Sequence, residues 1–272
     1  MEYLSIASDV PTVNGEKTML PNKFDPRVAS FWDSESQHWT MKYAKRTSYF
    51  YRCRTFYEFF KTAGLQCASI LDYGCGSGDI SFPMLQDGHS VIGVDIAEAM
   101  INKACDRAKA YGPSLNASYQ HLNDNIVATI SLKKFDVVVC SSVLEYVDDD
   151  MSLVRMFHST LKDGGFLLVS VPDVKSAFCK LDRWMHANKG LVPSFIPVEK
   201  LGYLDIQKRQ YDIGMFIEAV EKLGFRLLAR KHNTITLQRG ALMERISNIR
   251  GIGMLAIMMF QKGSPTTHGL GA

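Results

Sequence analysis

The sequence lacks the residue patterns that would make it a disulfide-stapled, metal-bound or membrane-spanning protein. Its six cysteines form no CxxC pair and no zinc-type spacing with histidine, so we expect reduced thiols and no metal. No apolar run approaches the roughly 18–20 residues that cross a bilayer. Glu2 and Asp9 stand where a signal peptide would carry basic residues followed by an apolar run. These absences predict a soluble, cytoplasmic protein.

An excess of one charge sign is also missing. The 272 residues include 31 Lys and Arg against 28 Asp and Glu, a net charge of +3, which is far from the basic excess of a dedicated nucleic-acid binder. The 20 glycines and 9 prolines follow no period, which argues against collagen-like and generally disordered chains. We therefore expect one globular core with appendages and no nucleic-acid partner. A homo-oligomer is compatible with the sequence.

Short β-rich runs alternate with helical patterns from residue 69 onward. Runs such as SVIGVD, FDVVVC and FLLVSVP are almost continuously apolar, as in strands that are covered on both faces. The alternation predicts an α/β fold with a parallel sheet and helices on both faces. The expected strands are residues 69–73, 90–95, 118–122, 135–141, 166–171, 225–231 and 254–260. Helices are expected after Gly78 and at residues 98–110, 149–161 and 215–223.

Local residues refine two of these helices. Pro83 falls inside the helix after Gly78, where a proline removes one main-chain hydrogen bond and bends the helix. Met215 and Phe216 fall on the apolar face of the helix near residues 215–223, which Gly224 is expected to end.

The segment at residues 24–60 precedes the alternation and is rich in aromatic residues. It holds 12 of the 29 aromatic residues of the chain. Phe56, Phe59 and Phe60 have the i, i+3, i+4 spacing of a helix anchored in the core. Trp32 and its aromatic neighbours exceed what that face requires, which favours a lid over a planar or hydrophobic substrate.

Basic residues are interleaved with these aromatic residues. They suit the carboxylate of a cofactor or an anionic substrate, although a solvated basic face is the default interpretation. The alternation is also similar to an RNA-binding stripe, an alternative that the near-neutral net charge disfavours. The residues are Lys42, Lys45, Arg46, Arg52 and Arg54.

A glycine-rich loop follows the first expected strand. Gly74, Gly76 and Gly78 lie between a strand and a helix, where glycine lets the backbone turn sharply and a helix start supplies free N–H groups. The next strand ends at Asp95, 17 residues after Gly78. A carboxylate at that place can accept hydrogen bonds from both hydroxyls of a ribose, or it can cap the next helix. Together these features indicate a nucleoside cofactor.

The motifs resemble those of class I S-adenosylmethionine-dependent methyltransferases, in the small-molecule branch that includes ubiquinone-pathway and magnesium-protoporphyrin O-methyltransferases. The similarity runs over residues 68–173, where LDYGCGSG, VIGVDIAEAM, HLND, FDVVVCSSVLEYV and LKDGGFLLVSVP follow in the order of the family. Dinucleotide dehydrogenases carry GxGxxG instead, which disfavours a nicotinamide oxidoreductase. The resemblance implies a Rossmann-like, seven-stranded, mostly parallel sheet, S-adenosyl-L-methionine as cofactor and a small-molecule substrate.

The resemblance also implies site residues. Asp72 would orient the amino group of the cofactor, and Asp95 would hold its ribose hydroxyls. Asn123 and Asp124 compete for the contact with the adenine amino group. Ser141 would lie near the amino-acid end of the cofactor or would be an ordinary turn serine. The residues implied to contact the cofactor are Asp72, Gly74, Cys75, Gly76, Gly78, Asp95, Ile96, Met100, Asn123, Asp124 and Ser141.

No obligatory catalytic side chain is identified, because methyl transfer from a sulfonium depends largely on positioning. Many relatives have histidine where this chain has Tyr146, so a histidine base is absent from that turn. Tyr146, His38 and His186 are candidate proton acceptors, since the two histidines lie in segments expected to cover the active site. Other titratable groups considered are His158, expected to be solvated, His232 and Asp173. The [DN]PPY sequence is absent, which disfavours methylation of nucleobase amines.

The favoured hypothesis is methyl transfer to a small, aromatic or hydrophobic metabolite in a biosynthetic pathway, with O-methylation preferred over C- or N-methylation. The alternative is a protein that binds S-adenosylmethionine without transferring its methyl group, as a regulator or as the catalyst of another reaction. The expected division is a flexible N-terminus (1–21), an aromatic-rich helical lid (22–62), a methyltransferase domain (63–263) and a flexible tail (264–272). A substrate insertion is expected at about 173–211, which is too long for a simple connection after strand five.

Overall fold

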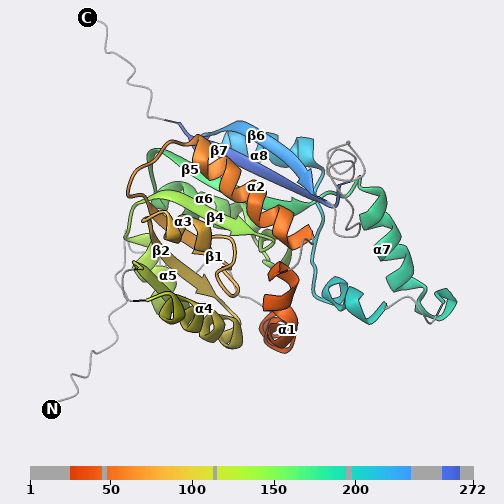
Figure 1. The fold of residues 1–272 in the computed structure, drawn as a ribbon. Coiled ribbons are helices and arrows are strands. Elements are labelled where there is room, and N and C mark those ends of the chain that lie inside the picture. Colours follow the sequence, from red (N-terminus) through yellow and green to blue (C-terminus); the bar gives the residue numbers. More distant parts are fainter. Residues whose placement is uncertain (1–24, 45–47, 113–114, 194–197, 234–252, 264–272) are drawn as a thin grey trace, which may run out of the picture.

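The centre of the fold is a seven-stranded sheet, shown in Figure 1. We describe it from a computed structural model that covers residues 25–44, 48–112, 115–193, 198–233 and 253–263; the expected flexible ends, 1–21 and 264–272, lie outside these residues. Its strand order is β3-β2-β1-β4-β5-β7-β6. The strands are β1 (Ser69–Tyr73), β2 (Ser90–Asp95), β3 (Ala117–His121), β4 (Phe135–Ser141), β5 (Leu161–Pro172), β6 (Phe225–Asn233) and β7 (Leu255–Lys262). Neighbouring strands are parallel except β7, which is antiparallel to β5 and β6. The predicted α/β fold is confirmed.

Helices lie between successive strands from β1 to β6, and in the described residues α1 and α2 precede the sheet. The α-helices are α1 (Pro26–Ala44), α2 (Ser48–Thr62), α3 (Phe82–Gln86), α4 (Glu98–Tyr111), α5 (Asp124–Ser131), α6 (Asp150–Thr160), α7 (Ala177–Ala187) and α8 (Ile213–Lys222). The described residues also form the 3-10 helices η1 (Leu144–Tyr146), η2 (Lys189–Leu191) and η3 (Val198–Asp205). In the part of the chain that the structure describes, no helix is long and apolar enough to cross a membrane.

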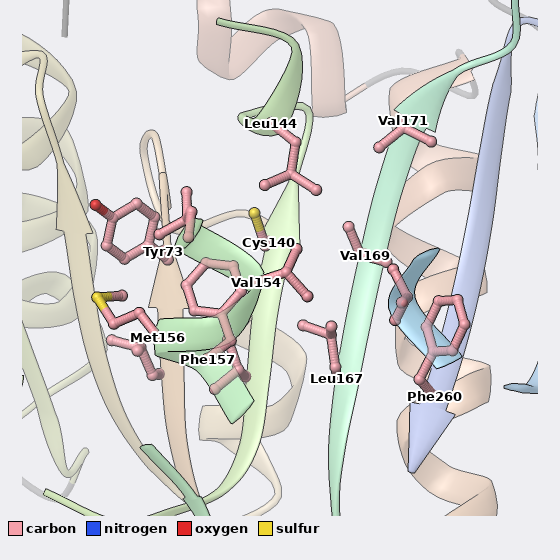
Figure 2. Packing of buried hydrophobic residues seen from close by; sticks show 14 of the residues in the cluster. Tyr73, Cys140, Leu144, Val154, Met156, Phe157, Leu167, Val169, Val171 and Phe260 are labelled. Carbon is pink, nitrogen blue, oxygen red and sulfur yellow. The ribbon is translucent and has the colours of Figure 1, made fainter. Parts of the chain in front are cut away.

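The two faces of the sheet carry separate hydrophobic cores. Successive side chains of a strand point to opposite faces, so Val137 and Val139 of β4 pack with α2 and α3, whereas Val138 and Cys140 pack with α6 and α8. Figure 2 shows the second core, in which Phe157 of α6 lies against the strands. Each fully buried side chain of this size contributes about 1.5–3 kcal/mol, so both layers are firmly fixed to the sheet.

Strand order places a crevice at one edge of the sheet. β1 pairs with β2 on one side and with β4 on the other. The chain therefore adds β2 and β3 on one side of β1 and then crosses back to add β4 on the other side. Ligands of open α/β sheets bind outside the carboxyl ends of the strands at such a switch point.

Three local predictions are wrong. Pro83 lies in the first turn of the five-residue helix α3, where its missing N–H breaks no helical bond and no kink arises. Met215 is 71% exposed, because Asp212 caps α8 so that Ile213, Phe216 and Val220 form its buried face. His158, expected to be solvated, is half-buried, with its ring 5.1 Å from that of Phe225.

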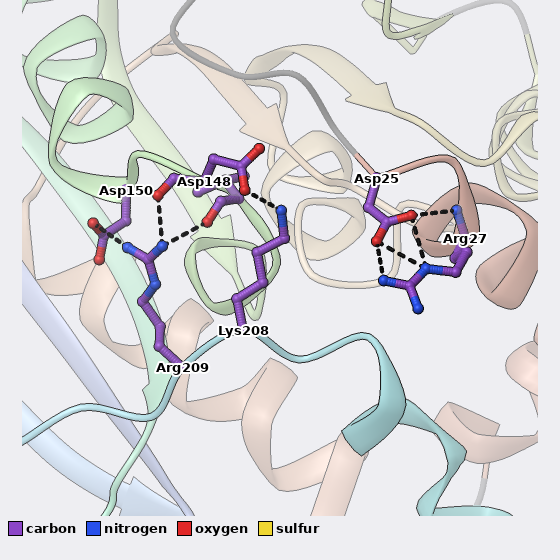
Figure 3. A network of polar contacts seen from close by, with 7 residues as sticks. Asp25, Arg27, Asp148, Asp150, Lys208 and Arg209 are labelled. Carbon is purple, nitrogen blue, oxygen red and sulfur yellow. Dashed lines mark hydrogen bonds and ion pairs between the residues drawn. The ribbon is translucent and has the colours of Figure 1, made fainter.

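Segments outside the sheet flank its carboxyl edge. Phe56, Phe59 and Phe60 of α2 are buried at 0–5% exposure, as their spacing predicts. The chain between β5 and α8 forms α7, η2 and η3, and α7 extends to one side of the sheet (Figure 1). Polar contacts fasten the end of this segment to the turn before α6 (Figure 3): Arg209 lies 2.6 Å from Asp150, and Lys208 pairs with Asp148. The segment is thereby held over the carboxyl ends of the strands.

Candidate active site

A cavity opens at the carboxyl ends of β1, β2 and β4, and the space within it, open solvent included, is about 1270 Å³. Residues of the glycine loop form its floor. The two N-terminal helices and the segment after β5 contribute its other walls, through residues such as Trp32 and Tyr203. The cavity is therefore lined both by the glycine-loop motif and by the two segments, at the N-terminal helices and after β5, to which the family resemblance assigned no cofactor residue.

The glycine loop takes a conformation that few other residues permit. Gly74 has a φ of 74°, and a Cβ built on it would lie 2.1 Å from Cγ2 of Val143. The amides of Gly74 and Cys75 both donate to the carbonyl of Val94, at 2.7 and 3.0 Å. The loop thus packs directly against the turn that follows β4 and is tied to β2.

Asp95 organises the loop from the end of β2. Its Oδ2 accepts a hydrogen bond from the amide of Gly76 at 2.8 Å, and its Oδ1 accepts one from the amide of Ala97 at 2.8 Å. Burial raises the pKa of this carboxyl. Each carboxylate oxygen has a second acceptor site, and the side chain lines the cavity, so a bound diol could still donate to it. Asp95 therefore serves the start of α4 and faces the cavity at once.

Asp72 is a buried carboxyl with an unused acceptor. It is 1% exposed, it lines the cavity, and its Oδ2 has no hydrogen-bond partner. Burial, and after it the nearby carboxylates of Asp95 and Asp79, raise the pKa of Asp72 to about 7. A buried carboxylate oxygen without a hydrogen-bond partner is costly, so this site favours a cationic or hydrogen-bond-donating ligand.

Aromatic rings form another part of the cavity wall. Trp32 of α1 meets Tyr146 of η1 edge to face, with ring centroids 5.9 Å apart. Tyr203 of η3 lines the same cavity, and its hydroxyl donates to Asp182 of α7 at 3.0 Å. Burial raises the pKa of Tyr146 well above its ordinary value. The wall is suited to a planar or apolar molecule, and the hydroxyls of Tyr146 and Tyr203 do not ionise near neutral pH.

Two further buried charged side chains, Arg52 and Glu145, line the cavity. Arg52 of α2 is 7% exposed, donates to Oγ of Ser142 at 3.3 Å, and has an Nε without a partner. Glu145 is 2% exposed, and its Oε2 also has no hydrogen-bond partner. Burial raises the pKa of Glu145 to about 7, against the opposing effect of Arg52. The cavity wall thus holds a buried cation and a buried carboxyl near each other, and each has one polar atom without a hydrogen-bond partner.

The structure brings most of the expected cofactor residues to this one cavity. Those that line it, together with Tyr146, are Asp72, Gly74, Cys75, Gly76, Asp95, Ile96, Met100 and Ser141. Oγ of Ser141 lies 3.1 Å from that of Ser170, and Val143 occupies the N-cap of the next helix, so Ser141 does not cap it. The roles implied for these residues remain predictions.

Other expected residues lie outside the cavity wall. Gly78 has a φ of 73° and lies against Tyr119, whose hydroxyl would be 2.9 Å from an added Cβ, so the glycine is needed for packing. Asn123 caps α5 by accepting from the amide of Ile126 at 3.0 Å, and Asp124 is exposed in the first turn of that helix. Leu122, the residue before them, lines the cavity instead.

Of the two candidate histidines, only His186 has a side chain within the described residues. His186 of α7 pairs with Asp205 at 3.0 Å and is absent from the cavity wall. The side chain of His38 lies outside the described residues. Within the described ranges no group of three or more His, Cys, Asp or Glu could hold a metal ion.

Sequence reasoning missed part of the wall. Glu145 was read only as part of a motif, and Tyr203, Gln207 and Gln210 lay in the unassigned segment after β5. The one available signal was a carboxyl within the apolar run SSVLEYV, because an isolated charge among buried residues is rarely present without a role.

Comparison with known proteins agrees with this geometry. A family model described as "Methyltransferase domain" matches residues 43–228, which is more than half of the chain. The chain therefore belongs to the methyltransferase-domain family.

Two relatives are named ubiquinone biosynthesis O-methyltransferase. The one from Pseudomonas paraeruginosa is 36% identical over 108 residues, which are 40% of this chain and 46% of the relative. The one from Bordetella avium is 30% identical over 160 residues, which are 59% of this chain and 63% of the relative. The chain thus spans about half to three fifths of the length of these relatives.

Solved structures share the fold at low sequence identity. Magnesium protoporphyrin IX methyltransferase from Synechocystis PCC 6803, with bound SAH, has a TM-score of 0.61 at 17% identity and covers 88% of this chain and 99% of its own. The [4+2]-cyclase SpnF has a TM-score of 0.62 at 15% identity and covers 89% and 98%. The fold is therefore common to a methyltransferase and to a protein named for another reaction.

Proposed function

We propose that the protein transfers the methyl group of S-adenosyl-L-methionine to oxygen of a small aromatic or hydrophobic metabolite. The observation that carries the proposal is the cavity, whose wall combines the glycine loop and its buried carboxyls with aromatic side chains. Family membership and the names of the relatives support the reaction class.

The residues present fit this cofactor group by group. The unpartnered Oδ2 of Asp72 suits the amino group of the methionine part, and the buried guanidinium of Arg52 suits its carboxylate. Asp95 suits the ribose hydroxyls, and Ile96 and Met100 suit an apolar base. When bound, the cofactor supplies a methyl group that its positive sulfonium already activates.

The protein's contribution is then positioning and exclusion of water. The loop and Asp95 fix one reactant, while Trp32, Tyr146 and Tyr203 hold the other against it. We place the acceptor-binding residues on the N-terminal helices and on the segment after β5, as a lid and a substrate insertion.

Two measurements test the proposal together. Calorimetric titration should give tight binding of S-adenosylhomocysteine and none of NAD. Incubation with methyl-labelled S-adenosylmethionine and a panel of hydroxylated aromatics should move the label to at least one acceptor. Tight NAD binding without S-adenosylhomocysteine binding would replace the proposal with a nicotinamide enzyme. Binding of the cofactor with no transfer to any acceptor would favour a role without methyl transfer.

A further inference from the structure

Three carboxyl groups line the cavity among the described residues, and their surroundings assign them different tasks. Asp95 accepts two main-chain hydrogen bonds and holds the loop. Asp72 lies at the end of β1 beside that loop, where its unused oxygen suits the cofactor. Glu145 belongs instead to η1, beyond β4, on the same short helix as Tyr146 of the aromatic wall. Of the three carboxyl groups, Glu145 is the one best placed to contact the molecule that receives the methyl group.

The position of Glu145 is held from several sides. Its carbonyl accepts from the amide of Lys208 at 2.8 Å, which ties η1 to the segment after β5. Ser142, three residues earlier, has a φ of 55°, a left-handed conformation that serine rarely adopts, and its amide donates to the carbonyl of Ser170. Such conformations cost about 1–3 kcal/mol and persist where the surrounding structure imposes them.

Tyr146, the other candidate proton acceptor in the cavity wall, cannot take a proton at neutral pH. Tyr146 is already protonated there, because burial and then Glu145 raise the pKa of its hydroxyl further above the ordinary value. His186 pairs with Asp205 away from the cavity. Glu145, by contrast, is 2% exposed, is one of the residues that line the cavity, and has a buried Oε2 without a hydrogen-bond partner.

We propose that Glu145 is the proton acceptor of this site and that the acceptor molecule carries an un-ionised aromatic hydroxyl. The O–H bond breaks and its proton passes to Oε2 of Glu145. The electron pair left on oxygen forms the bond to the methyl carbon, while the bond from that carbon to sulfur breaks with its pair on sulfur. Glu145 returns the proton to solvent after product leaves. This inference rests on the proposed methyl transfer.

Among the titratable groups around Glu145, the Glu145 carboxyl is the one that ionises near neutral pH. Burial raises the pKa of Glu145 to about 7, while its own main-chain amide, the guanidinium of Arg52 in α2 and a hydrogen bond from Ser142 act to lower it. Cys140 of β4, Tyr146 of η1 and Tyr211 before α8 all have raised pKa values and stay protonated. The rate with an un-ionised phenol should therefore rise with pH through about 7 as the carboxylate forms.

Two phenols of similar size test the inference. 4-Ethylphenol keeps its proton at pH 8, whereas 4-nitrophenol is ionised and needs no base. At saturating cofactor, Glu145→Gln should lower kcat with 4-ethylphenol by about 100-fold or more and change kcat with 4-nitrophenol only a few-fold. Glu218→Gln, the same change at an exposed residue of α8, serves as the control. Equal losses with both phenols, or no loss with 4-ethylphenol, would overturn the assignment.

A binding measurement with S-adenosylhomocysteine present gives a readout without turnover. Wild type should prefer 4-ethylphenol, because the Glu145 carboxylate accepts its hydrogen bond and repels a phenolate. Glu145→Gln should shift that preference toward 4-nitrophenol by about tenfold, roughly the effect of one charge-assisted hydrogen bond. An unchanged preference would mean that Glu145 is only structural.

Remaining outcomes separate this inference from the proposed function. If Glu145→Gln does not fold, the wild-type pH profiles decide, with pentafluorophenol as the second phenol because it is already an anion well below pH 7. A larger rise through about 7 with 4-ethylphenol than with pentafluorophenol is expected, and two identical profiles contradict the inference. Asp72 also has a raised pKa of about 7, but its ionisation affects both phenols alike. Wild type that methylates neither these phenols nor any hydroxylated aromatic would refute the proposed methyl transfer itself.

Discussion

Replacing Asp72 by Asn should stabilise the protein at high pH and weaken cofactor binding at the same time. The carboxyl is 1% exposed with an unused oxygen, and burial raises its pKa from 3.8 to about 7. The folded state therefore holds the Asp72 proton more tightly than the unfolded state does. The resulting penalty is absent below pH 3.8, grows as pH rises, and reaches about 4 kcal/mol above pH 7.

Asn carries no charge at any pH, so its cost of about 1–3 kcal/mol for imperfect hydrogen bonds stays constant. The free energy of unfolding of Asp72→Asn, minus that of wild type, should rise by roughly 2–3 kcal/mol between pH 5 and pH 8. Urea unfolding without cofactor at several pH values measures this difference. Asp106→Asn, at a side chain that is 79% exposed, should show no such rise. Parallel pH curves for Asp72→Asn and wild type would refute the reasoning.

The same substitution should weaken S-adenosylhomocysteine binding by about 1.5–3 kcal/mol, or roughly 10- to 150-fold, because a charged hydrogen-bond partner is lost. Calorimetric titration measures it. A variant that is more stable and binds equally well would show that the empty acceptor at Asp72 does not serve the cofactor.

Three further predictions follow from the same site. Asp95→Ala should weaken S-adenosylhomocysteine binding by about 2–3 kcal/mol, and unchanged affinity in calorimetry would remove the ribose assignment. Gly74→Ala should destabilise the fold by about 2–4 kcal/mol in urea unfolding, because the added Cβ meets Val143 and φ is 74°; Val143→Ala should restore part of the loss, and no loss would contradict the clash. Deleting residues 1–45, which removes Trp32 from the wall, should reduce turnover more than cofactor affinity; a stable, fully active truncation would refute the lid.

The sheet could be predicted from the sequence because burial on both faces leaves a strong signal. The expected strands at 69–73, 90–95 and 135–141 coincide with β1, β2 and β4. The buried face of a helix was less predictable, because moving the start of a helix by one or two residues changes which side chains point to the core and which to solvent. Asp212 sets the start of α8 and so exposes Met215, and the start of α3 at Phe82 makes Pro83 harmless.

The site was predictable where a motif fixes the backbone and not where tertiary packing chooses the side chains. Asp72 and Asp95 end adjacent parallel strands, so their meeting at one edge follows from strand order. Tyr203 and Arg52 reach the same cavity from segments 151 residues apart, and nothing local determines that approach. His186 is the opposite case. Its place in the segment after β5 suggested a catalytic role, but its side chain pairs with Asp205 and does not line the cavity.

A crystal structure with S-adenosylhomocysteine bound tests the central claim most directly. We predict that the ligand occupies the cavity, with its amino group within hydrogen-bond distance of Oδ2 of Asp72, its ribose hydroxyls on Asp95, and its sulfur facing the side of the cavity that holds Glu145 and Tyr203. A ligand bound elsewhere, or one whose ribose turns away from Asp95, would contradict the account.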